Sequence, residues 1–197
     1  MKVLCLGAHG KRLEKYLRLQ GDEVAFFEDP IMPGSKLLKD ADFLVSFGYR
    51  YLLPNKILCQ FPKRAINLHI SFLPWNRGAD PNLWSFLEDT PKGATIHYMI
   101  DRLDAGDILL QEEVNFGPTE TLTSSYETLM LTAVKLFERN WPEIKNDRKR
   151  SIIQPKGGTF HNKKDAEAYR YLLRKGWETP VSELVRKALC KKENQLS

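Results

Sequence analysis

The sequence has few cysteines and no long apolar run, and both absences narrow the class of protein. Cys5, Cys59 and Cys190 are an odd number of thiols without the spacing of a metal site, so we expect reduced cysteines, no bound metal and a cytoplasmic protein. The chain contains no run of about 18 apolar residues, so we expect no membrane-spanning helix and no membrane partner. Internal repeats and low-complexity tracts are also missing, which leaves an ordinary globular protein.

Two catalytic signatures are absent as well. The glycines after the first expected strand, Gly7 and Gly10, do not complete the G-x-G-x-x-G fingerprint, which disfavours a nicotinamide-dependent oxidoreductase. No G-x-S-x-G motif occurs, so no nucleophilic serine is indicated. We therefore expect any group transfer to be direct, without a covalent enzyme intermediate.

The charge of the chain is positive, with a net charge of +5 and a pI of about 9.0. A basic balance suits either nucleic acid or a small anionic molecule. The basic residues gather late, at 145–151, 162–164 and 189–197, and aromatic residues are not interleaved with them. The stacking pattern of a nucleic-acid module is therefore missing, and we expect an anionic small molecule and no nucleic acid partner.

The apolar pattern of the first part of the chain predicts alternating strands and helices. Short apolar runs indicate strands at 2–8, 23–29, 40–49, 63–70, 93–100 and 107–116. Apolar residues at helical spacing indicate helices at 11–21, 81–89 and 119–146. This order predicts an α/β fold with a mostly parallel sheet, in which the last two strands form a hairpin across 101–106.

The character of the sequence changes after Asn146. Residues 151–165 indicate an extended segment with a Gly-Gly turn, and 165–176 and 180–192 indicate two short helices. We therefore expect an α/β domain at 1–148 and a small C-terminal appendage at 149–197.

Two polar residues share one face of the strand at 63–70, because side chains alternate along a strand. Asn67 and His69 lie on that face, and apolar residues lie on the other. A buried polar group costs roughly 1–3 kcal/mol unless it is hydrogen-bonded, so the pair forms either a structural network or a functional site. Its position near the C-terminal end of the strand, where ligands of open α/β sheets bind, favours a functional site.

The turn that contains Asp104 supplies a carboxylate. By itself, Asp104-Ala105-Gly106-Asp107 is typical of a hairpin turn with a local aspartate hydrogen bond. If the turn lies at the same end of the sheet as His69, the carboxylate orients the imidazole and favours its charged form. Together, the amide of Asn67, the imidazole of His69 and the carboxylate of Asp104 then suit acyl transfer to an amine. Asn67 and His69 would donate hydrogen bonds to the oxyanion, and Asp104 would help to remove the proton of the amine.

The segment "NLHISFLP" at 67–74, followed 35 residues after His69 by Asp104 in "LDAGDI", resembles the folate-dependent formyltransferase family. The resemblance covers about residues 40–115. It implies a Rossmann-like catalytic domain at 1–148, 10-formyltetrahydrofolate as co-substrate, and Asn67, His69 and Asp104 as the catalytic residues. It also implies that backbone groups of 49–53 and 100–103 hold the pterin ring, at Tyr49, Tyr51, Leu53, Ile100, Asp101 and Leu103.

Within this family, 73–98 and "GGTFHNKKD" at 157–165 look most like the small nucleotide-sugar N-formyltransferases. Their acceptor is the amino group of a nucleotide-linked deoxyaminosugar. The residues that we expect to bind the acceptor are Trp75, Asn76, Arg77, Asp80, Asn82 and His161. An ordered surface loop is the alternative for the first five, and His161 could instead close the appendage onto the body. Trp84 is expected in the core, and His97 there or as a partner of the site.

Two relatives fit the sequence less well. The first strand is followed by "GAHG", which lacks the Gly-x-Ser-Asn loop of glycinamide ribonucleotide formyltransferase. The appendage of about 50 residues is short for the RNA-binding domain of methionyl-tRNA formyltransferase. These two activities and a 10-formyltetrahydrofolate hydrolase remain the alternatives, and a homodimer is left open.

Overall fold

The computed structural model describes residues 1–189, which form two compact units. The first unit comprises 1–69, 95–110 and 133–154, and the second comprises 70–94, 111–132 and the described residues from 155 onward. The sequence predicted one boundary, at residue 148, whereas each of the two units combines three segments of the chain. The division into a domain at 1–148 and an appendage at 149–197 stays a prediction. Cys190 and the end of the helix expected at 180–192 lie outside the described residues.

A six-stranded sheet has the order β2-β1-β3-β4-β6-β7. The strands β1 (Lys2–Leu6), β2 (Glu23–Phe27), β3 (Phe43–Phe47) and β4 (Ala65–His69) are parallel, and β6 (Gly93–Tyr98) is antiparallel to β4. The strand β7 (Ile108–Glu113) neighbours β6, and the Tyr98 N–H donates to the Asp107 carbonyl where the two strands meet their turn. The expected mostly parallel sheet and its hairpin are both present.

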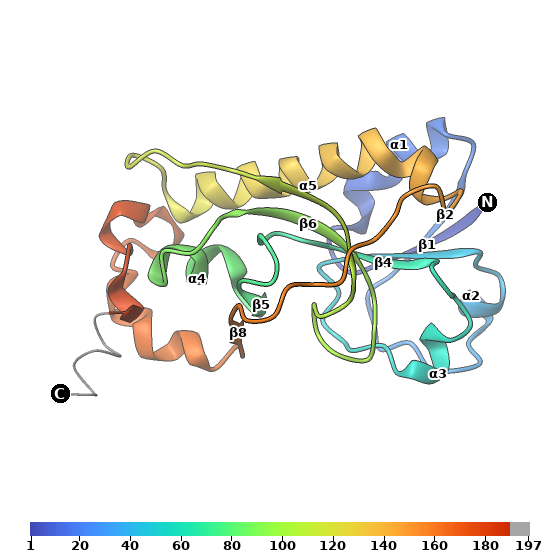
Figure 1. Ribbon diagram of the computed structural model, residues 1–197, viewed down its shortest axis with the longest axis horizontal. Helices are drawn as coiled ribbons and strands as arrows, with labels where there is room; N and C mark the ends of the chain where they lie inside the picture. Colours follow the sequence, from blue (N-terminus) through green and yellow to red (C-terminus); the bar gives the residue numbers. More distant parts are fainter. Residues whose placement is uncertain (190–197) are drawn as a thin grey trace. The chain divides into compact units, whose positions relative to one another are not determined.

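Helices cover both faces of the sheet in the first unit. Figure 1 shows α1 (Glu14–Leu19) and the C-terminal half of α5 (Leu122–Ile144) on one face, and α2 (Lys36–Lys39) and α3 (Asn55–Leu58) on the other. A 3-10 helix, Gly10–Leu13, precedes α1. Because a covered parallel strand has no solvated face, β3 is buried along its whole length. Within residues 1–189, no helix is long and apolar enough to cross a bilayer.

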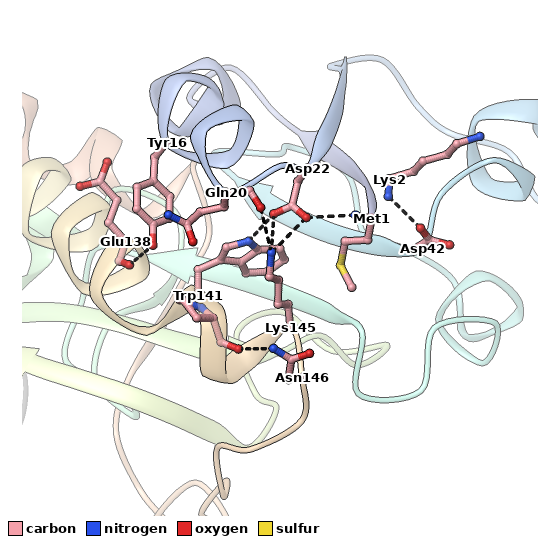
Figure 2. Close-up of polar contacts among 11 residues, drawn as sticks. Met1, Lys2, Tyr16, Gln20, Asp22, Asp42, Glu138, Trp141, Lys145 and Asn146 are labelled. Atoms are coloured by element: carbon pink, nitrogen blue, oxygen red, sulfur yellow. Dashed lines mark hydrogen bonds and ion pairs between the residues drawn. The ribbon is translucent and has the colours of Figure 1, made fainter.

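A buried carboxylate, Asp22, ties the C-terminal end of α5 to the start of the sheet (Figure 2). The indole N–H of Trp141 donates to Asp22 Oδ2 at 2.7 Å, and Lys145 Nζ lies 3.1 Å from the same oxygen. The amino group of Met1 lies 3.1 Å from Asp22 Oδ1. Burial would raise the pKa of Asp22, but these hydrogen bonds outweigh burial and lower the pKa below its ordinary value. The carboxylate is therefore charged in the folded protein and holds the helix in place.

The second unit contains α4 (Pro81–Leu87), the N-terminal half of α5, and the short parallel strands β5 (Arg77–Gly78) and β8 (Phe160–His161). Where we expected two helices after residue 165, the described part contains mainly 3-10 helices, at Asp165–Leu172, Gly176–Glu178 and Val181–Glu183. Gly176, with a positive φ of 57°, and Pro180 lie between the first and the last of these segments, where neither residue favours a continuous helix.

Candidate active site

The strand β4 places Asn67 and His69 on one face of the sheet, as the alternation of side chains predicts. His69 is buried, with 8% of its surface exposed, and Asn67 is half-buried. In the register between β4 and β6, Asn67 lies opposite His97, and His69 lies opposite Thr95. Directly opposed residues share a face, so His97 joins the two residues that the sequence predicted.

Asp104 reaches this face from the turn between β6 and β7. Its Oδ1 accepts a hydrogen bond from Asn67 Nδ2 at 3.0 Å, and its Oδ2 lies 3.7 Å from His69 Nδ1. The Asp104 side chain is only 11% exposed. Its φ of 50° is left-handed, a conformation that costs about 1–3 kcal/mol but that aspartate adopts more readily than most residues. The structure thus brings together the three side chains that we expected to act as a set.

His97 completes the cluster, with a side chain that is 2% exposed. Its Nδ1 lies 2.9 Å from the Tyr98 carbonyl, and because a carbonyl only accepts, Nδ1 must carry a proton. Its Nε2 lies 3.2 Å from Asn67 Nδ2 and 3.4 Å from Asp104 Oδ1. A neutral ring accepts a hydrogen bond from Asn67, whereas a charged ring donates one to Asp104. His97 is therefore both a core residue and a partner of the predicted set.

The turn that carries Asp104 is held by Gln154, a residue that we did not single out from the sequence. Gln154 Nε2 lies 3.0 Å from the Asp104 carbonyl oxygen and 3.1 Å from that of Gly106. A Cβ atom on Gly106 would lie 1.9 Å from the Tyr98 carbonyl oxygen, so only glycine fits at this close approach. The sequence carries no signal for Gln154, because its partners are backbone carbonyls far away in the chain.

The residues that we associated with the pterin ring all belong to the first unit. Leu53 is buried in an apolar cluster, so only its backbone could meet a ligand. Tyr51 and Leu103 are exposed. Ile100 is half-buried and Asp101 is exposed.

Tyr49 fixes the loop that follows β3. Its hydroxyl donates to the Asp29 carbonyl at 2.8 Å and accepts the Ile31 N–H at 3.1 Å. Burial raises the pKa of Tyr49, so the hydroxyl keeps its proton and remains a donor. The side chain of Tyr49 is thereby turned toward the connection between β2 and α2, and its backbone is the part that remains to meet a ligand.

A cavity of about 260 Å³ lies in the first unit beside the segment that follows β6. Ile100 and Asp101 line it, together with the apolar side chains of Leu58, Phe61 and Met99. Small-molecule sites are typically concave and apolar with a few polar groups, and this cavity has that character.

In the second unit, two predicted acceptor residues are buried amides with internal partners. Asn76 donates to Thr90 Oγ1 at 2.7 Å and accepts from Thr159 Oγ1 at 3.1 Å. Asn82 donates to the Leu122 carbonyl at 3.0 Å. The amides therefore shape the loop from inside, and their contact with an acceptor stays a prediction.

His161 and Arg77 join β8 and β5 within the second unit. The His161 ring stacks on Trp84, with 3.7 Å between the ring centroids, and its Nε2 lies 3.1 Å from Glu88 Oε2. The Arg77 guanidinium donates to the Gly157 carbonyl at 3.2 Å. Trp84 is buried, as expected. Trp75 and Asp80 are half-buried, and the acceptor contacts of these residues stay predictions.

The first-unit cluster provides one carboxylate, two imidazoles and one amide. It can accept a proton and donate hydrogen bonds to an anionic oxygen, and this chemistry requires no nucleophilic side chain. Among the residues that the structure describes, no three His, Cys, Asp or Glu side chains come together as metal ligands would.

The comparison with family models and the comparison with solved structures both identify formyl transferases. A family model described as formyl transferase matches residues 33–139. The crystal structure of the formyltransferase PseJ from Anoxybacillus kamchatkensis, in complex with UDP-4,6-dideoxy-4-formamido-L-AltNAc and tetrahydrofolate, is 50% identical, with a TM-score of 0.93. That match covers 95% of this chain and 100% of the PseJ chain, and it confirms the expected fold class.

Two further structures are more distant. A 4-N formyltransferase from Francisella tularensis is 25% identical over 85% of this chain and 78% of its own, with a TM-score of 0.75. A methionyl-tRNA formyltransferase from Clostridium thermocellum is 15% identical over 85% of this chain and 74% of its own, with a TM-score of 0.65, and shares the fold.

Proposed function

We propose that this chain, which belongs to the formyl transferase family, moves the formyl group of 10-formyltetrahydrofolate to the amino group of a nucleotide-linked deoxyaminosugar. The family and the class of enzyme that "NLHISFLP" and "LDAGDI" predicted are confirmed. The observation that carries the proposal is the 50% identity to PseJ over 95% of the chain. The cytoplasmic location and the homodimer stay predictions.

The likeness to PseJ also suggests which acceptor to test first. PseJ was crystallised with a UDP-linked 4-formamido sugar and tetrahydrofolate. These are the two products that formyl transfer from 10-formyltetrahydrofolate to a 4-amino sugar would give. We therefore propose a UDP-linked 4-amino-4,6-dideoxy sugar as the acceptor of this chain.

In the proposed reaction, the acceptor amine attacks the formyl carbon, and the new C–N bond replaces the bond to the folate nitrogen. His69 donates a hydrogen bond to the oxygen that becomes negative, which lowers the barrier most when the donor is already in place. Asp104 accepts the proton that the amine loses. The proton that the departing folate nitrogen needs comes from His69 or from water.

Asn67 has a second task in this scheme. Its amide nitrogen is directed at Asp104 Oδ1 and His97 Nε2, so it first holds the carboxylate in place. When Asp104 takes up the proton, its oxygen becomes a weaker acceptor, because a neutral carboxyl binds a donor less strongly than a carboxylate. The Asn67 N–H can then turn to the oxyanion.

For the co-substrate, we propose that the cavity beside Ile100 and Asp101 receives the pterin ring. Its apolar side chains suit a flat heterocycle, and we propose that backbone groups of the segments beside it supply the hydrogen bonds. The backbone groups of Tyr49, Tyr51, Leu53 and Leu103 are proposed as further contacts.

For the acceptor, we propose Arg77, Trp75 and Asp80 as the residues that meet the nucleotide and the sugar. A guanidinium suits a diphosphate because it offers several N–H donors in a fixed plane. Asn76, Asn82 and His161 are proposed as the residues that give this loop its shape.

The test is incubation of the protein with 10-formyltetrahydrofolate, with and without a UDP-linked 4-amino-4,6-dideoxy sugar, while tetrahydrofolate and the formamido product are measured. We expect both products only when the sugar is present. Formate release that does not depend on the sugar would instead support the hydrolase. Absence of transfer to this sugar and to other nucleotide-linked aminosugars would refute the proposal.

The residue assignments need variants of their own. We expect Asn67→Ala and His69→Ala each to lower kcat about 10²–10³-fold, the usual effect of losing an oxyanion donor. Asn140→Ala is the matched control, because the half-buried Asn140 amide donates to the Leu136 carbonyl of its own helix, away from the β4 pair. If both site variants turn over like the control, the polar pair on β4 is structural.

A further inference from the structure

The segment that follows α5 returns to the sheet beside β7. Ile152 and Ile108 exchange two backbone hydrogen bonds, each of 2.8 Å, in an antiparallel bridge. Ile152 is 60% exposed and Ile153 is 84% exposed, so apolar burial contributes little to holding this segment. The bridge is the contact that directs the chain toward the turn between β6 and β7.

Two residues beyond the bridge, Gln154 turns its side chain to that turn. Its Nε2 donates to the backbone carbonyls of both Asp104 and Gly106, at 3.0 and 3.1 Å. A glutamine amide carries two N–H groups, so both bonds can form at once. One side chain thereby clamps the peptide group between Asp104 and Ala105 and the peptide group between Gly106 and Asp107.

The turn has a backbone conformation that such a clamp would stabilise. Asp104 has a left-handed φ of 50°, which an unrestrained aspartate leaves readily for more common conformations. The same residue places its carboxylate against Asn67, His97 and His69. Because rates are sensitive to shifts of about 1 Å in a catalytic group, a small relaxation of the turn would matter.

We propose that Gln154 is a positioning residue for Asp104. By clamping the turn, it fixes the distance from the carboxylate to the two imidazoles and to the reacting amine. The inference rests on the proposed function for its kinetic readout, although the clamp itself can be measured without catalysis. In this proposal, the segment between α5 and Gln154 contributes to the site, because it brings Gln154 to the turn that carries Asp104.

The kinetic test compares the parent with Gln154→Met, which keeps the length of the side chain and removes both donors. We expect kcat to fall about tenfold to a hundredfold while the KM for the acceptor stays near that of the parent. Gln154→Glu, which places a carboxylate against two carbonyl oxygens, should fall further. Gln60→Met is the matched control, because Gln60 also donates to a backbone carbonyl, that of Lys56.

The second readout is the NMR spectrum of the histidine rings, which is tractable because the chain has four histidines. We expect the ring signals of His69 and His97 to shift in Gln154→Met and those of His9 and His161 to stay. Unmoved His69 and His97 signals, or a kcat equal to that of Gln60→Met, would overturn the proposal. If the parent transfers no formyl group to any aminosugar, the proposed function fails, and the ring signals alone decide whether Gln154 positions Asp104.

Discussion

Replacement of Asp104 by asparagine is the sharpest test of the candidate site. Asparagine has the same shape and tolerates the left-handed φ of 50°, so the backbone of the turn should survive. The amide oxygen can keep the hydrogen bond from Asn67, but an NH₂ group then takes the place of the oxygen that lies 3.7 Å from His69 Nδ1. The variant therefore loses the proton acceptor and mismatches one buried contact.

The size of the effect follows from these two losses. General acid–base help is worth roughly 10²–10⁴-fold in rate, so we expect Asp104→Asn to raise the activation barrier by about 3–5 kcal/mol. A mismatched buried polar contact costs about 1–3 kcal/mol of unfolding free energy, so the melting temperature should fall modestly. Folate binding should persist, because the proposed pterin contacts are backbone groups and the wall of the nearby cavity.

The assay measures kcat by tetrahydrofolate formation, folate affinity by titration, and thermal unfolding on the same preparations. Asp107→Asn is the control, because Asp107 belongs to the same turn but is exposed. A kcat for Asp104→Asn equal to that of Asp107→Asn would show that Asp104 is only a turn residue. Loss of folate binding would contradict the backbone model of the donor site.

Three further changes test other parts of the molecule. Arg77→Ala should raise the acceptor KM and leave the folate KM unchanged. The control is Arg174→Ala, at an exposed arginine outside the proposed donor and acceptor segments, and a rise in folate KM alone would place Arg77 on the donor side. Met99→Trp should fill the cavity of about 260 Å³ and weaken folate binding at least about tenfold, and unchanged affinity would move the pterin ring elsewhere. Asp22→Asn should cost about 1.5–3 kcal/mol of unfolding free energy at neutral pH, because it removes charge-assisted hydrogen bonds. Since folding lowers the pKa of Asp22 below its ordinary 3.8, this difference from the parent should shrink only as the pH falls below that value, and a difference that is constant down to low pH would contradict the assigned charge.

Local patterns in the sequence determined much of the fold and the identity of the central residues. The period of two along β4 placed Asn67 and His69 on one face, and apolar residues at helical spacing predicted the helix at 119–146, where α5 lies. These features follow from backbone geometry within one element, so a single sequence contains them. The motif at 67–74 and the spacing from His69 to Asp104 together predicted the family.

Local patterns failed where a short segment lacked a strong period. The expected helices at 165–176 and 180–192 are largely 3-10 turns in the described part of the chain. Isolated short helices are marginal, so packing against the rest of the unit decides their geometry. Asn76 and Asn82 show the same dependence, because their burial follows from partners on distant segments.

The tertiary structure decided that His97 is a partner of the site, a role that the sequence left open, and it alone identified Gln154. His97 meets Asn67 because β6 pairs with β4 in one register, and a shift by one residue would have turned its ring to the other face. Gln154 meets the Asp104 turn because a backbone bridge at Ile152 brings back a segment that is 50 residues away along the chain. Register and long-range pairing depend on the free energy of the whole fold, so no local pattern encodes them, whereas the alternation that placed Asn67 beside His69 is a property of the strand alone.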